Sequence, residues 1–243
     1  MPGLQTPSHC VTRWRTTALE LDFLYITDGK DSPEGFSPAN WPVIATALDG
    51  RWRSAVDILR PADLELLAPG LAEKAAITLV DTRAAVPTDR TVEDRGMIIH
   101  SAAPIRLSDG QTGALVGGRL LNRNLDFIDT INALVYREQS LPDGSQGTAT
   151  LFLDDVRVST NVRLFENVRA LGTRVSAAVR KRVLGDGQVW LDRAFVVNDW
   201  YISAYEPIVD SHGARVGMLY VGFLEAPFRA AKVNSVLTIT LLF

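Results

Sequence analysis

The chain has 243 residues, of which 47% are hydrophobic and 22% are charged, so it can bury the core of one large domain or two small ones. Its formal net charge of −3 and the scatter of its basic residues argue against a nucleic-acid-binding surface. Cys10 is the only cysteine, and the histidines His9, His100 and His212 do not have metal-ligand spacing. These counts exclude an internal disulfide, and we expect no metal site and no cofactor.

The two ends of the chain differ in character. Residues 1–20 lack a basic stretch followed by an apolar run, so no signal peptide is visible. Residues 233–243 form an apolar run that is far shorter than the ~20 residues needed to cross a bilayer. This run fits either a terminal strand or docked helix end, or the first turns of a transmembrane helix.

The first half of the chain predicts a mixture of helices and strands. Leucines at helical spacing and turn residues such as Asp28-Gly29 and Asp49-Gly50 delimit the elements. Ser108-Asp109-Gly110 is typical of a hairpin turn. We expect strands at residues 21–27, 77–81, 96–107 and 112–121, and helices at 41–48 and 61–76, the latter interrupted by Pro69-Gly70.

A helix and a turn-rich stretch then separate two β-rich blocks. Residues 125–136 carry apolar side chains on one helical face, namely Leu125, Ile128, Ile131, Leu134 and Val135. Residues 140–147 are rich in Gly, Ser, Pro and Asp, and we expect the domain boundary there.

The second block predicts the layout of a PAS-like domain. Val175, Val179 and Val183 recur every four residues, which indicates a helix that ends at Gly185. We expect strands at residues 148–153 and 156–160, and a three-stranded meander at 189–197, 200–209 and 215–224.

An internal repeat indicates that one fold occurs twice. Residues 101–118 and 203–222 each contain a strand that ends in Pro-Ile, a Gly-containing turn and a second strand with small residues. Duplication of a small α+β fold explains this similarity better than chance likeness between hairpins.

The sequence contains no recognisable catalytic motif. It has no G-x-S-x-G, no phosphate-binding loop and no G-x-G-x-x-G. The acidic positions Asp154-Asp155, Glu93-Asp94 and Asp109 are expected to lie in turns and face water. We therefore predict no catalytic residue, and the alternative of a small-metabolite enzyme would depend on Asp199, Glu206 or His212.

Polar and aromatic side chains interrupt the apolar strands of the second block. Tyr201, Ser203 and Tyr205 share one strand face by the two-residue period. Buried polar groups need partners, and guanidinium groups suit carboxylates. The cluster predicts a small pocket for an organic acid, whereas structural ion pairs and surface tyrosines are the alternative. The candidate ligand-binding residues are Arg157, Thr160, Asn161, Arg193, Tyr201, Ser203 and Tyr205.

These residues resemble a known family. The segments 147–152, 156–162, 169–176, 193–201, 204–208 and 217–225 resemble the membrane-proximal Cache domain of bacterial double Cache sensors. The segments 71–75, 95–99 and 120–124 resemble the membrane-distal partner. The resemblance covers residues 21–228.

The resemblance implies an α+β fold with two tandem PAS-like Cache domains, each an antiparallel sheet flanked by helices. It implies a remnant of an N-terminal helix (1–20), a distal domain (21–124), a helical linker (125–146), a proximal domain (147–228) and the start of a truncated transmembrane helix (229–243).

The same resemblance implies a function. It implies the periplasmic ligand-sensing part of an inner-membrane receptor, most simply a homodimeric sensor histidine kinase that binds a small molecule and no nucleic acid. The fold also resembles the periplasmic domains of citrate-type sensor kinases, in which the positions of Arg157 and Thr160 contact ligand. Ser203 and Tyr205 replace basic residues there, which argues against a tricarboxylate and leaves a smaller monocarboxylate or an amino-acid-like solute as alternatives. A spacer that binds no soluble ligand remains the further alternative.

Overall fold

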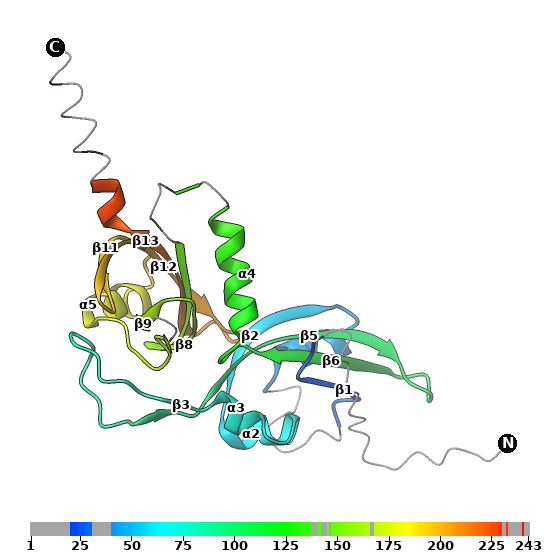
Figure 1. The fold of residues 1–243 in the computed structure, drawn as a ribbon. Helices are drawn as coiled ribbons and strands as arrows, with labels where there is room; N and C mark the ends of the chain where they lie inside the picture. The colour runs from blue at the N-terminus through cyan, green and yellow to red at the C-terminus, as the bar shows by residue number, and fades with distance from the viewer. Residues whose placement is uncertain are drawn as a thin grey trace. The chain divides into compact units, whose positions relative to one another are not determined.

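A computed structural model gives the fold of residues 20–30, 40–137, 140–141, 145, 147–165, 168–229, 232 and 240 (Figure 1). The chain forms two compact units. Unit 1 comprises Met1–Ala76, Asp94–Asn122 and Val209–Ala214, and unit 2 comprises Ile77–Glu93, Arg123–Ile208 and Arg215–Phe243.

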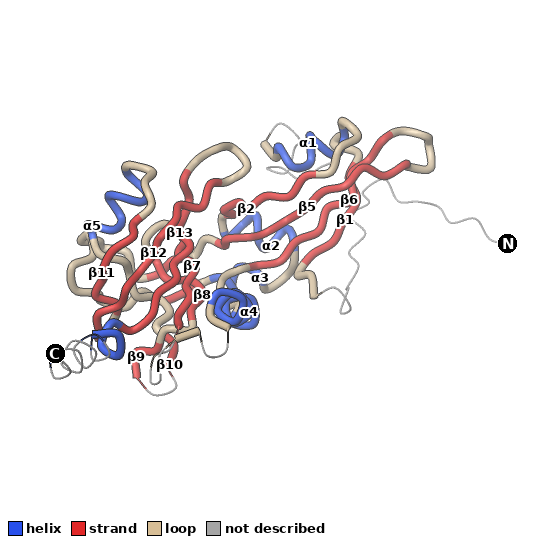
Figure 2. Tube along the Cα trace, turned by 90° about the horizontal axis from the view of Figure 1, so that it is seen from above, coloured by secondary structure: helices blue, strands red, loops and turns tan. Residues whose placement is uncertain are grey.

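Unit 1 is built on a four-stranded antiparallel sheet with the strand order β1-β6-β5-β2 (Figure 2). Its strands are β1 (Phe23–Thr27), β2 (Arg53–Leu59), β5 (Gly96–Arg106) and β6 (Thr112–Leu120). Its helices are α1 (Pro42–Leu48), α2 (Pro61–Leu67) and α3 (Leu71–Ala75).

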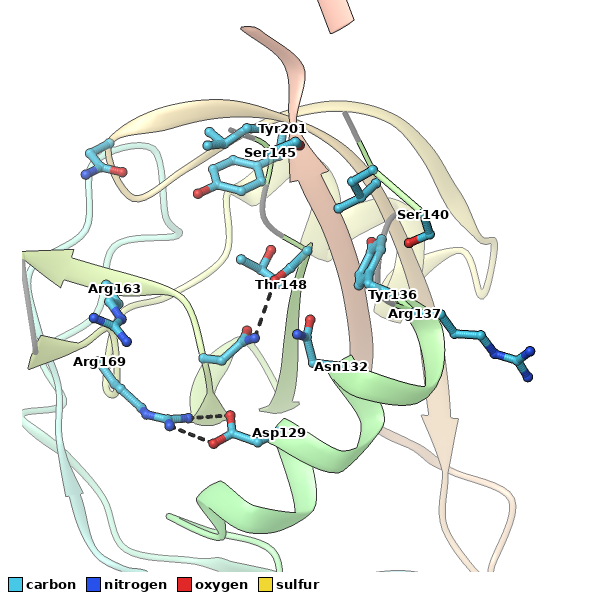
Figure 3. Close-up of a pocket in the computed structure, with 15 residues that line it drawn as sticks. Asp129, Asn132, Tyr136, Arg137, Ser140, Ser145, Thr148, Arg163, Arg169 and Tyr201 are labelled. Atoms are coloured by element: carbon cyan, nitrogen blue, oxygen red, sulfur yellow. Dashed lines mark hydrogen bonds and ion pairs between the residues drawn. The ribbon is translucent and has the colours of Figure 1, made fainter. Parts of the chain in front are cut away.

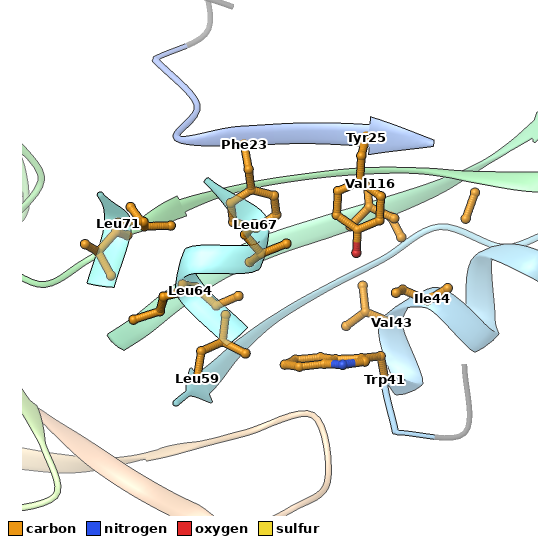
Figure 4. Packing of buried hydrophobic residues seen from close by; sticks show 14 of the residues in the cluster. Phe23, Tyr25, Trp41, Val43, Ile44, Leu59, Leu64, Leu67, Leu71 and Val116 are labelled. Atoms are coloured by element: carbon orange, nitrogen blue, oxygen red, sulfur yellow. The ribbon is translucent and has the colours of Figure 1, made fainter. Parts of the chain in front are cut away.

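The helices of unit 1 begin and end where local chemistry requires it. Proline occupies the first turn of α1 and of α2, where its missing N–H costs no helical hydrogen bond. Gly70 takes a left-handed φ of 79° between α2 and α3, which breaks the predicted helix 61–76 into two. The helices and the sheet enclose one apolar core, which includes Phe23, Ile44, Leu64 and Val116 (Figure 4).

Unit 2 is built on a five-stranded sheet with the strand order β11-β12-β13-β7-β8. Its strands are β7 (Gly147–Leu153), β8 (Val156–Thr160), β11 (Trp190–Val196), β12 (Asp199–Val209) and β13 (Arg215–Leu224). The short pairs are β3 (Ile77–Thr78) with β4 (Val92–Glu93), and β9 (Arg163–Phe165) with β10 (Val168–Arg169). The predicted meander of the last three strands is confirmed.

The helices of unit 2 are α4 (Leu125–Val135) and α5 (Ala177–Arg180), which continues as a π-helical turn, η1 (Lys181–Gly185). Asn124 caps α4 through its side chain, which accepts from the Phe127 backbone N–H at 3.1 Å. Val179 and Val183 point into the core, where they join Phe152, Tyr205 and Tyr220. The valine spacing thus predicted both the helix and its buried face.

The elements predicted at the two ends of the chain can hardly be compared with the structure. The N-terminal remnant helix (1–20) and the transmembrane start (229–243) lie almost wholly outside the described residues. Within the described part of the chain, no helix combines the length and apolar character required to span a membrane.

Candidate ligand-binding site

A cavity among the described residues of unit 2 contains Arg157, and we refer to it as the Arg157 cavity. It has a volume of about 740 Å³, within the range typical of small-molecule sites. Its walls are mainly apolar and include Leu164, Val175, Val179, Trp190, Ala194 and Val197. The polar residues Arg157 and Tyr205 lie among them.

Arg157 is a buried cation whose charge has little compensation. Its side chain leaves β8, and the residue is 3% exposed. Its Nε and Nη1 atoms are buried and have no hydrogen-bond partner among the described residues. The guanidinium lies over the Phe152 ring, 5.0 Å from its centroid. Burial lowers the pKa of Arg157, because removal from water penalises the charged form.

The backbone fixes the position of Arg157. Its N–H donates to the Thr173 carbonyl at 2.9 Å, and its own carbonyl accepts from the Gly172 N–H at 3.0 Å. The register of β7 and β8 shifts between Leu151 and Phe152, which pairs Phe152 with Arg157. Such irregularities re-aim a side chain relative to a regular ladder.

The acidic residue closest in sequence to Arg157 forms an ion pair with a different arginine. Asp155 is 1% exposed and accepts from Arg174 Nη2 at 2.6 Å and Nε at 3.2 Å. Arg174 Nη1 donates to the Val86 carbonyl at 2.6 Å, so all three of its nitrogens are engaged. The sequence-based expectation that Asp155 faces water is therefore wrong. The same correction applies to Glu93, which is 1% exposed and pairs with Arg90 at 2.8 Å.

Tyr205 supplies a neutral hydroxyl to the same cavity. It is 2% exposed, and its ring lies 6.0 Å from Phe152 and 4.7 Å from Tyr220. Burial raises the pKa of Tyr205 to about 12, although Arg157 acts in the opposite direction. At neutral pH the phenol is thus protonated and can donate a hydrogen bond.

Comparisons with known proteins identify this part of the chain. Residues 119–235 match the family model described as single Cache domain 3. This segment is therefore similar to Cache sensor domains. The chain also aligns with a solved structure, the ligand-binding domain of the Pseudomonas aeruginosa PAO1 amino-acid chemoreceptor PctC in complex with GABA. The two share 15% identity over 85% of this chain and 75% of that one, with a TM-score of 0.30. A search of curated proteins gave no match.

Three of the predicted ligand-binding residues have structural partners within the Cache domain. The Thr160 hydroxyl bonds to Thr150 Oγ1 at 2.6 Å, and the Ser203 hydroxyl donates to the Tyr201 carbonyl at 3.4 Å. Asn161 Oδ1 accepts from the Ala149 N–H at 2.7 Å. Neither Thr160 nor Ser203 lines either of the two cavities.

Arg193 also lines the Arg157 cavity, but its guanidinium is bonded to Glu225, which does not line it. The β11–β12 register pairs Arg193 with Ile202, so it lies on the strand face opposite to Tyr201 and Tyr205. Its guanidinium donates to Glu225 at 2.8 and 2.7 Å and lies 4.8 Å from the Trp200 ring centroid. The structure does not bring Arg193 and Arg157 together as two free cations.

Asn161 and Tyr201 line a second cavity of about 620 Å³ (Figure 3). This cavity is predominantly polar. Tyr201 lies at one end of the view, and the ion pair of Asp129 with Arg169, at 2.8 and 2.7 Å, lies at the other. Asp129 raises the pKa of Arg169 through these hydrogen bonds. Arg169 and Asp129 are thus paired with each other, unlike Arg157.

Unit 1 holds a buried polar cluster that sequence reasoning missed. The Asp57 carboxylate contacts His100 Nε2 at 2.6 Å and accepts from the Ser211 N–H and hydroxyl at 3.0 and 2.8 Å. Burial acts to raise the pKa of Asp57, but these hydrogen bonds and the His100 charge outweigh it, so the pKa is lowered. The serine donates to the carboxylate and not to the imidazole, so the cluster lacks the base that activates a serine nucleophile.

Proposed function

We propose that this chain is the extracytoplasmic ligand-sensing part of a transmembrane receptor, and that its Cache domain binds a small organic acid at Arg157. The single observation that carries the proposal is the buried guanidinium of Arg157, which lines a cavity and has no acidic partner among the described residues. A buried charge without a counter-charge is costly. A carboxylate in the cavity supplies that charge and accepts paired hydrogen bonds from a guanidinium.

The same geometry argues against the two alternatives. A spacer that binds nothing is expected to fill its interior with side chains, whereas this domain keeps a cavity of about 740 Å³ beside a buried cation. An enzyme requires a base within reach of its substrate. Asp199, Glu206 and His212 are exposed, and none of them lines either cavity.

We propose that binding is transmitted along the sheet. Arg157 lies on β8 and Tyr205 on β12, and β13 lies next to β12. Strand β13 ends at Leu224, and residues 225–229 have helical backbone. A ligand that contacts Arg157 and Tyr205 would favour one sheet geometry and so shift the end of β13. Such coupling is typically ~1–3 kcal/mol.

The receptor context is also a proposal. Unit 1 has its own antiparallel sheet, helices and core, which supports a tandem arrangement of two domains. The spans 21–124 and 147–228 stay predictions, because unit 2 includes Ile77–Glu93 and unit 1 includes Val209–Ala214. The linker 125–146, the periplasmic location, the homodimer, the inner-membrane anchor and the histidine kinase output stay predictions from the sequence resemblance.

A thermal-shift screen against small acids, amino acids, amines and purines tests the proposal. A ligand at 100 times its Kd should add ~2.7 kcal/mol of stability to the folded state. This stabilisation should disappear in Arg157→Met and persist in Arg182→Met. Arg182 is an exposed arginine outside both cavities that donates to the Val189 carbonyl at 3.1 Å, so it is a matched control. If no acid stabilises the wild-type chain, the proposed function is wrong.

A further inference from the structure

We infer that the ligand of the Arg157 cavity carries one carboxylate on an apolar body and no ammonium group. This inference rests on the proposed function and specifies the ligand class. Four features of the cavity carry it: the number of cations without an acidic partner, the location of the acids, the type of polar atom that is left without a partner and the aliphatic remainder of the lining.

The cavity can pair with one anionic group, because only one buried cation in its lining lacks an acidic partner. Arg174 is engaged at all three nitrogens by Asp155 and Val86. Arg193 is bonded to Glu225. Arg83, the remaining arginine of the lining, is exposed, where water and salt weaken its attraction. A second ligand carboxylate would therefore lose its hydration without gaining a buried counter-charge.

The cavity offers no buried acid to a ligand ammonium. Asp155 is occupied by Arg174, and the carboxylate that lines the cavity, Asp81, is exposed. In an α-amino acid the ammonium is bonded to the carbon that carries the carboxylate, so it would lie close to the Arg157 guanidinium. Like charges at such short range in a partly desolvated site are unfavourable.

The buried polar atoms of the lining residues that have no partner are all hydrogen-bond donors. They are Nε and Nη1 of Arg157 and the indole Nε1 of Trp190. Trp190 pairs in register with Tyr205, whose phenol is protonated at neutral pH. Donors of this kind favour a ligand group that only accepts hydrogen bonds, which a carboxylate does and an ammonium does not.

The remaining lining favours an apolar ligand body. Leu164, Val175, Val179 and Val197 present aliphatic surface to the cavity. Burial of hydrocarbon against such walls is favourable, because it removes apolar surface from water. A hydroxylated or amide-rich body would instead lose hydrogen bonds to water that these side chains do not replace.

Four ligands of equal chain length isolate each feature. Pentanoate carries one carboxylate and a terminal methyl group, and 4-aminobutyrate replaces that methyl with an ammonium. Glutarate replaces it with a second carboxylate, and pentanamide removes the charge from the head group. We propose isothermal titration calorimetry of each against the 243-residue chain, against Arg157→Met and against Arg182→Met, with 4-phenylbutanoate as a larger apolar acid.

The inference predicts that pentanoate or 4-phenylbutanoate binds, and that 4-aminobutyrate, glutarate and pentanamide bind at least ~10-fold more weakly, which corresponds to ~1.4 kcal/mol. Arg157→Met should abolish binding of the acids, and Arg157→Gln provides a second variant if the first misfolds. Glutarate or 4-aminobutyrate binding as tightly as pentanoate, with the same dependence on Arg157, overturns the inference and leaves the proposed function standing. Failure of every acid, here and in the broad screen, overturns both.

Discussion

Replacement of Arg157 by methionine should stabilise the ligand-free protein. Arg157 is 3% exposed, and two of its guanidinium nitrogens have no partner among the described residues. Replacing a buried ion pair by apolar groups of similar volume is often neutral or stabilising by ~1–4 kcal/mol, and Arg157 lacks even the partner charge that offsets part of the desolvation cost. Against this gain stands the loss of the contact with Phe152, which is worth ~0.5–2 kcal/mol and is partly replaced by a sulfur–aromatic contact.

Taking the middle of each range, the net expectation is a gain of about 1 kcal/mol in the free energy of unfolding. For a chain of this length, each kcal/mol raises Tm by roughly 2–4 °C. Urea and thermal denaturation of wild type and Arg157→Met without ligand measure the difference directly. Arg182→Met should remain within ~0.5 kcal/mol of wild type, as expected for an exposed site. An Arg157→Met variant less stable than wild type would refute the reasoning, because it would mean that the charge of Arg157 is already compensated in the free domain.

Three further predictions concern the frameworks of the two units. Asp57→Asn should cost ~1–3 kcal/mol in urea denaturation, because it weakens the bonds to His100 and Ser211. The pKa of Asp57 is lowered on folding, so its stabilisation is complete above its unfolded pKa of ~3.9. The gap between wild type and Asp57→Asn should therefore close as pH falls through the folded pKa, and a gap that widens contradicts this sign. Asn122→Ala should cost ~2–4 kcal/mol, since its amide bonds three backbone groups, and unchanged stability would contradict this role. Gly172→Ala should lower Tm, because Gly172 has a φ of 78° and an added Cβ would meet the Thr78 carbonyl oxygen; an unchanged Tm would be inconsistent with that contact.

The sequence predicted most of the elements of unit 2, because their patterns are local. Valines at helical spacing identified α5 and η1, and turn residues delimited β11, β12 and β13. The shared face of Tyr201, Ser203 and Tyr205 follows from the two-residue period, and all three side chains are buried. Strand β2 was not predicted, because Asp57 interrupts its apolar pattern. That residue is tolerated in the interior through its bonds to His100 and Ser211, 43 and 154 residues away.

The composition of the site depended on information that one sequence does not contain. Tyr201 and Tyr205 share a face but reach different cavities, and only the tertiary structure separates them. Asp155 has the local signature of an exposed turn, yet Arg174, 19 residues away, makes its burial possible. Arg193 and Arg157 are similar residues in similar strands. The strand register and the partner Glu225 decide that Arg193 is paired, whereas Arg157 has no acidic partner in the described chain.

The most direct test of the central claim is a crystal structure of the chain with the acid that gives the largest stabilisation in the screen. Our account predicts electron density for that acid in the Arg157 cavity, with its carboxylate oxygens ~2.7–3.2 Å from the Arg157 guanidinium nitrogens. It also predicts that the acid's hydrocarbon part contacts Val175 and Val179. An acid bound in the second cavity, or with its carboxylate turned away from Arg157, would contradict the account.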